Sequence, residues 1–81
     1  MDITTRATII ANKVENDSSI SAFQRVTLDF IARQLELKDP IIKSTGEQPW
    51  RVESLAAKML VEREIFKKIG RFNNKDTYIR V

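Results

Sequence analysis

The chain has no cysteine and no histidine among its 81 residues. A chain of this length can form one small domain, and without these residue types neither disulfide bonds nor a zinc site of cysteine and histidine can reinforce it. Its stability must therefore come from a single apolar core, to which a second copy of the chain or another partner can add buried surface. We expect residues 1–81 to form one domain.

The missing residue types also limit the chemistry that the chain can perform. There is no imidazole to act as a general base and no thiolate to act as a nucleophile. Gly46 and Gly70 lie too far apart to form a phosphate-binding glycine loop, and Glu62 and Glu64 would diverge on a helix. We expect a protein that is not an enzyme and that has no catalytic residue, no cofactor and no metal site.

The hydropathy of the chain bears on its location. No stretch approaches the roughly 18 apolar residues that a membrane-spanning helix needs. The first residues, from Met1 to Arg6, are acidic and then polar, with no hydrophobic run behind them, so they do not resemble a secretory signal. We expect the chain to act in the cytoplasm and not on a membrane.

A first helix is predicted near the N-terminus. Few residues that break helices are present, since the chain has only two glycines and two prolines. Apolar residues recur there at spacings of three and four, which predicts a helix over residues 4–15 and a turn at residues 16–19. The residues of this apolar stripe are Ile3, Ala7, Ile10 and Val14.

A second, longer helix is predicted over residues 19–38. Its apolar residues fall on one broad face at about 100° per residue, and they are Ile20, Phe23, Val26, Phe30, Ile31, Leu35 and Leu37. The helix should end at Asp39, because a residue before proline, here Pro40, is disfavoured in helical conformation. A face this broad would contact more than one neighbouring element.

The segment from residue 51 to residue 70 is predicted to contain two short helices. A start near Trp50 suits Pro49, which is tolerated at the first position of a helix. One straight helix would place Arg63 in the middle of the apolar face, so a break near Leu60 or Val61 fits the pattern better. Gly70 would end the second helix, and the turn-forming residues 73–76 predict a C-terminal hairpin.

These elements predict a mainly α fold. We expect a small single domain of three to four helices with a short C-terminal β-hairpin, and a helix-turn-helix or winged-helix-like arrangement is one form of it. The expected core residues are Phe23, Phe30, Ile31, Leu35, Leu55, Met59, Phe66 and Ile69.

Residues 55–69 resemble a helix-turn-helix. The residues that carry the resemblance are Leu55-Ala56, Met59, Val61 and Phe66. Leu60 departs from the pattern, because the turn usually has a glycine at this place. A helix followed by a hairpin with a basic tip and a final strand is also the order seen at the end of winged helix-turn-helix domains. The resemblance implies binding to double-stranded DNA.

Positive charge is concentrated at the C-terminal end. Residues 65–81 contain five basic side chains and one acidic side chain, Asp76, whereas residues 1–42 contain five basic and six acidic ones. The predicted DNA-binding residues are Arg63, Lys67, Lys68, Arg71, Lys75 and Arg80. Glu62 and Glu64 oppose this interpretation, because their charges would repel phosphates, and a solvated basic surface is the alternative.

Two functions remain open at this point. The first is a small basic DNA-binding or regulatory protein, expected to be a homodimer, that uses residues 52–70 and the basic hairpin. The second is a helical protein-interaction module, such as an adaptor, inhibitor or assembly subunit, that does not bind nucleic acid. The broad apolar face of residues 20–37 favours the second function. Trp50 would cap the core or serve as an exposed anchor for a partner.

Overall fold

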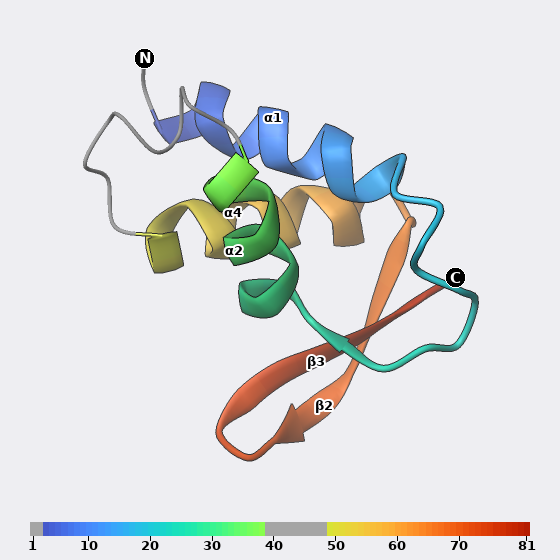
Figure 1. Ribbon diagram of the computed structural model, residues 1–81. Helices are drawn as coiled ribbons and strands as arrows, with labels where there is room; N and C mark the ends of the chain where they lie inside the picture. The colour runs from blue at the N-terminus through green and yellow to red at the C-terminus, as the bar shows by residue number, and fades with distance from the viewer. Residues whose placement is uncertain (1–2, 39–48) are drawn as a thin grey trace.

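The computed structural model describes residues 3–38 and 49–81, with side chains described over residues 3–35 and 51–81. In chain order the elements are helix α1 (Ile3–Glu15), strand β1 (Val26–Thr27), helix α2 (Leu28–Lys38), helix α4 (Pro49–Glu62), strand β2 (Phe66–Phe72) and strand β3 (Lys75–Arg80). Figure 1 shows the helices gathered together and the hairpin of β2 and β3 extending away from them.

The predicted mainly α fold is wrong, because the described residues form three helices and a three-stranded antiparallel sheet. The strand order is β1-β3-β2, so the hairpin gains a third strand from a distant part of the chain. Val26 and Thr27 pair with Tyr78 and Thr77 of β3. Both residues of β1 are β-branched and suit a strand. The domain is therefore a mixed α/β domain.

Helix α1 confirms the helix that was predicted over residues 4–15. Its apolar stripe, including Ala7, Ile10 and Val14, is almost completely buried. The stripe packs against α4, and α2 contacts both of these helices. The core thus lies between the three helices and the helix-facing side of the sheet, where Phe66 and Tyr78 are buried.

The predicted helix over residues 19–38 is wrong in its first half. Residues 16–25 form turns, the two residues of β1 follow, and α2 begins only at Leu28. The Asp17 side chain accepts hydrogen bonds from the Ser19 amide and hydroxyl, and Phe23 has a φ of 65°. Both features stop a helix, because the carboxylate satisfies the backbone locally and a left-handed residue cannot continue the helix. The structure describes α2 as far as Lys38, and the predicted end at Asp39 lies outside the described residues.

The predicted helix-turn-helix is also wrong. A break lies close to the predicted place, but a strand follows it in place of a second helix. The Ile65 amide donates to the Leu60 carbonyl and the Glu64 amide donates to the Val61 carbonyl, with Glu64 at a φ of 62°. This pair of bonds is a Schellman motif, which ends α4 and turns the chain into β2.

The predicted C-terminal hairpin is present. Asn73 and Asn74 have φ values of 53° and 63° and join Phe72 to Lys75, which are paired in register. Two left-handed residues form the type of turn that matches the twist of a hairpin. Gly70 does not end a helix. It lies in β2 at an irregularity of the register, with a φ of 150°.

The predicted core is partly correct. Phe66 and Ile31 are buried, and Leu35, Leu55 and Met59 are half-buried and pack against the core. Ile69 is half-buried. The prediction that Phe23 and Phe30 belong to the core is wrong, because their side chains are 79% and 62% exposed. The interpretation of Trp50 concerns a side chain outside the described residues.

Candidate functional site

The structure divides the six predicted DNA-binding cations between the two ends of the hairpin. Arg63 and Arg80 lie at its base, beside the C-terminal end of α1, whereas Arg71 and Lys75 lie near its tip. Lys67 and Lys68 lie between these ends on β2 and are exposed. The six side chains therefore do not form one surface.

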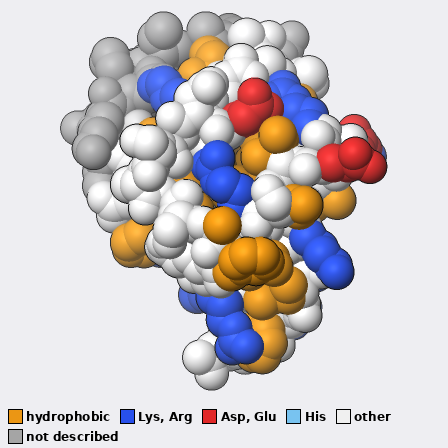
Figure 2. Space-filling model, turned by 90° about the vertical axis from the view of Figure 1, so that its right-hand side faces the viewer, with side chains coloured by type: hydrophobic (Ala, Val, Ile, Leu, Met, Phe, Trp, Pro, Cys, Tyr) orange, Lys and Arg blue, Asp and Glu red, His pale blue; other side chains and the backbone are white. Residues whose placement is uncertain are grey.

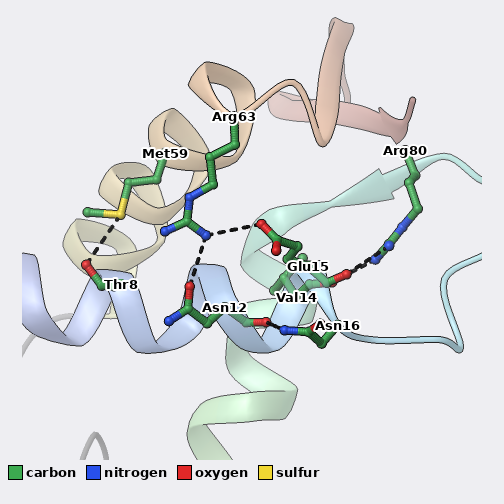
Figure 3. A network of polar contacts seen from close by, with 8 residues as sticks. All are labelled: Thr8, Asn12, Val14, Glu15, Asn16, Met59, Arg63 and Arg80. Carbon is green, nitrogen blue, oxygen red and sulfur yellow. Dashed lines mark hydrogen bonds and ion pairs between the residues drawn. The ribbon is translucent and has the colours of Figure 1, made fainter.

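Arg80 holds the end of α1. Its guanidinium donates to the carbonyl oxygens of Val14 at 2.7 Å, Glu15 at 3.0 Å and Asp17 at 3.2 Å, and Figure 3 shows its approach to the end of the helix. Val14 and Glu15 belong to the last turn of α1, where a cation interacts favourably with the helix dipole. The Val14 and Asp17 carbonyls also accept hydrogen bonds from the backbone amides of Asp17 and Ile20. The guanidinium also lies 5.6 Å from the centre of the Phe66 ring. Arg80 has a structural role.

Arg63 makes a second contact with α1. Its Nη1 lies 3.0 Å from Asn12 Oδ1 and 3.3 Å from Glu15 Oε1, as Figure 3 shows. Both partners belong to the last turns of α1, so Arg63 connects the end of α4 to α1. Its predicted role on a recognition helix is wrong, because it lies in the turn after α4.

Lys68 and Arg71 of β2 pair with one exposed carboxylate of β3, that of Asp76. Lys68 Nζ and Arg71 Nε lie 3.4 Å and 3.9 Å from Asp76 Oδ1. Arg71 also donates to the Asn74 carbonyl at 3.3 Å. All three charged side chains are at least 46% exposed. Exposed pairs of this kind contribute about 0–1 kcal/mol each, so they exchange readily with other partners.

Lys75 pairs with a carboxylate of α2. Its Nζ lies 2.6 Å from Asp29 Oδ2, and the Asp29 side chain is 23% exposed. Burial works to raise the pKa of Asp29, but hydrogen bonds from Lys75 and Thr27 and the nearby positive charge outweigh it, so the pKa lies below its ordinary value of 3.8.

Helix α4 and the tip of the hairpin line one groove of about 430 Å³. Ser54 and Lys58 face it from α4, and Arg71, Asn74 and Lys75 face it from the hairpin. Three carboxylates also line it, and they are Asp29, Glu53 and Asp76. We call this hollow the helix–hairpin groove. It offers three cations and several hydrogen-bonding groups on an open surface.

The sequence analysis did not predict the polar face of α4 beside this groove, from which Ser54 and Lys58 line it. Arg51, Ser54 and Lys58 are all exposed, and their spacings of three and four place them on one face of the helix. The polar face opposite the buried Val52, Ala56 and Leu60 could have revealed them.

A second, larger groove has a mainly apolar lining. It measures about 840 Å³ and lies between α2, the residues that precede β1 and the side of the sheet away from α4. Its apolar residues include Ile20, Phe30, Leu35 and Phe72, and its polar ones include Gln24 and Arg25. We call it the aromatic groove. Figure 2 shows hydrophobic side chains gathered in the lower half of one face, with lysine and arginine side chains around them.

In residues 3–38 and 49–81, no three acidic side chains come together in a way that could hold a metal ion. None of the helices in these residues is both long and apolar enough to cross a membrane.

Comparison with known proteins gives no relative: no protein-family model matches the chain, and no curated protein and no solved structure is similar to it. The geometry of the two grooves is therefore the basis for any proposal of function.

Proposed function

We propose that the chain is a small regulatory protein that binds double-stranded DNA through the helix–hairpin groove. The observation that carries the proposal is the shared groove, which brings Ser54 and Lys58 of α4 beside Arg71, Asn74 and Lys75 of the hairpin. The proposed contact residues thus differ from the six predicted from the sequence, because only Arg71 and Lys75 of those six line the groove, where Ser54, Lys58 and Asn74 join them. The proposal also requires the cytoplasmic location that the sequence predicts.

The dimensions of these elements suit a duplex. Helix α4 has 14 residues, so at 1.5 Å per residue it is about 21 Å long. Its exposed face, with Arg51, Ser54 and Lys58, would enter the major groove, which is about 12 Å wide. The hairpin tip would then contact the sugar–phosphate backbone through Arg71 and Asn74.

The carboxylates in the groove do not prevent this binding. Asp76 neutralises Lys68 and Arg71 in the unbound chain, but these pairs are exposed and weak. A phosphate can replace Asp76 as the partner of Arg71, because a guanidinium binds phosphate with two parallel hydrogen bonds. The pair of Lys75 with Asp29 is shorter and less exposed, so Lys75 contributes less to binding.

The test is a titration of a labelled random-sequence duplex by fluorescence anisotropy at several salt concentrations. The variant Lys58→Ala/Arg71→Ala should lower affinity about 10- to 30-fold at low salt and reduce the salt slope by about 2, because each lost phosphate contact changes the slope by about 0.9. The control is Arg33→Ala/Lys67→Ala. It removes the same charge from two exposed positions outside the groove and should change affinity less than about threefold.

Equal losses in the two variants would show that net charge and not the groove governs binding. Circular dichroism should confirm that both variants keep the wild-type fold. Absence of wild-type binding at low salt would reject the proposal.

The protein-interaction module remains the second candidate. The aromatic groove favours it, because Phe30 and Phe72 are 62% and 45% exposed and lie in one hollow. Large exposed aromatic side chains that share a groove are typical of protein interfaces. A chain that binds no duplex but self-associates or binds another protein through this groove would support the second candidate over the first.

A further inference from the structure

We infer that the aromatic groove is occupied by a second copy of this chain, which inserts Phe23 into it. The inference goes beyond DNA binding and does not depend on it. Two copies would exchange the same contact across a twofold axis, so the interface would bury two Phe23 side chains and two grooves.

Phe23 is unfavourable in the isolated chain for two reasons. Its side chain is 79% exposed, and its backbone has a φ of 65°. A bulky residue is less stable in this region than a residue that tolerates positive φ. Burial of the ring in a partner would remove the exposure of its apolar surface and help to offset the strain.

The local structure holds Phe23 in this position. The Gln24 amide donates to the Ser21 carbonyl at 3.3 Å, and the Gln24 side chain accepts hydrogen bonds from the Ser21 amide at 3.3 Å and hydroxyl at 3.1 Å. Phe23 is the third residue of this turn, where a positive φ ordinarily requires glycine or asparagine. The turn therefore presents the ring outward from a fixed backbone.

The protruding ring lies at the edge of a hollow that can accept it. Gln24 and Arg25, the next two residues, line the aromatic groove. Phe30 and Phe72 provide apolar surface there, and the Arg25 guanidinium lies 5.1 Å from the centre of the Phe72 ring. A projection and a hollow side by side on one face are self-complementary under a twofold rotation, because each copy offers what the other needs.

The charges on the groove are complementary to those of a second copy of the chain. Arg25 and Asp17 carry opposite charges on its lining, and Lys75 is paired with Asp29. This lining carries charges of both signs. It suits a partner with the same mixture, since Arg25 of each copy can face Asp17 of the other.

The experiment is sedimentation equilibrium of the full chain over a range of micromolar concentrations. The wild type should reach a mass of twice the 9.4 kDa of one chain. Phe23→Asn keeps a residue that tolerates positive φ and should weaken self-association at least about 30-fold, as expected of an interface hot spot. Phe30→Ser should have a similar effect. The control Val61→Ser changes an exposed apolar residue of α4 outside the groove and should leave the dissociation constant unchanged.

The double variant Phe23→Asn/Phe30→Ser identifies the contact. If the two rings meet across the interface, the double variant should associate little more weakly than either single variant, because their effects are not additive. Effects that simply multiply would contradict the insertion of Phe23 beside Phe30. A wild type that stays monomeric at every concentration, or a Phe23→Asn variant that dimerises as well as wild type, would overturn the inference.

Discussion

The base and the tip of the β2–β3 hairpin both carry arginines, but the arginines have different partners. At the base, Arg80 donates to three backbone carbonyls at the end of α1 and lies against Phe66. At the tip, Arg71 contacts an exposed carboxylate and one turn carbonyl. Basic residues close together in the sequence therefore have different roles: those at the base of the hairpin stabilise the fold, and those at the tip are open to a ligand.

The largest expected effect is at the base. Arg80→Ala leaves three carbonyls without their charged donor and should lower the free energy of unfolding by about 2–4 kcal/mol. Arg71→Ala should lower it by only about 0.5 kcal/mol, because it loses an exposed ion pair. Urea denaturation of the two variants measures the difference. Equal losses would erase the distinction between base and tip.

The next effect concerns ligand binding at the tip. Asp76→Asn releases Lys68 and Arg71 from their carboxylate, so affinity for a random duplex should rise about three- to fivefold at low salt. The free energy of unfolding should change by less than about 0.5 kcal/mol. A weaker affinity would mean that Asp76 positions Arg71 for binding.

The pKa of Tyr78, the one tyrosine of the chain, gives a second measurement on the Asp76→Asn variant. Burial of the phenol and the nearby charge of Asp76 raise the pKa of Tyr78 above its ordinary value of 10.0. Asp76→Asn removes the second cause, so a spectrophotometric titration should give a lower pKa than in the wild type. An unchanged pKa would mean that the hairpin tip differs from the structure described.

The smallest effect concerns pH and the pair of Asp29 with Lys75. The pKa of Asp29 is lower in the folded chain than its ordinary value of 3.8, so the folded state favours the charged carboxylate. This contribution to stability is present above pH 3.8 and is lost as the pH falls through the folded pKa. Asp29→Asn should therefore remove about 0.5 kcal/mol at pH 7 and almost nothing at pH 2. Unfolding curves at both values test this, and an equal effect at both would contradict it.

Features that depend on neighbouring residues could be predicted from the sequence. The spacing of Ala7, Ile10 and Val14 predicted α1, and Pro49 marked the start of α4. The Asn73-Asn74 pair predicted the turn of the hairpin, because asparagine tolerates positive φ. In each case the signal lies within a few residues of the feature.

Features that depend on distant residues could not be predicted from the sequence. β1 is a strand only because it pairs with β3, about 50 residues later. The helical spacing of Ile20, Phe23, Val26 and Phe30 was misleading, since two of them are buried in the core and the other two are exposed. The Schellman motif at the end of α4 was not predicted, because Glu64 occupies the left-handed position that is usually glycine.

The candidate site shows the same limit. Sequence analysis identified the basic C-terminal end but could not separate its cations, because the partners of Arg63 and Arg80 lie on α1, 48 to 66 residues away. Lys58 was not among the predicted contacts, although its spacing from Arg51 and Ser54 places the three residues on one face of a helix.

The most direct test of the account is a map of amide chemical shifts in isotope-labelled protein as a random-sequence duplex is added. We expect the largest changes at Arg51, Ser54 and Lys58 of α4 and at Arg71 and Asn74 of the hairpin tip, with little change at Asn12, Arg63 and Arg80. Changes concentrated at the base of the hairpin and the end of α1, or no changes under low-salt conditions, would contradict the assignment of the helix–hairpin groove as the duplex-binding surface.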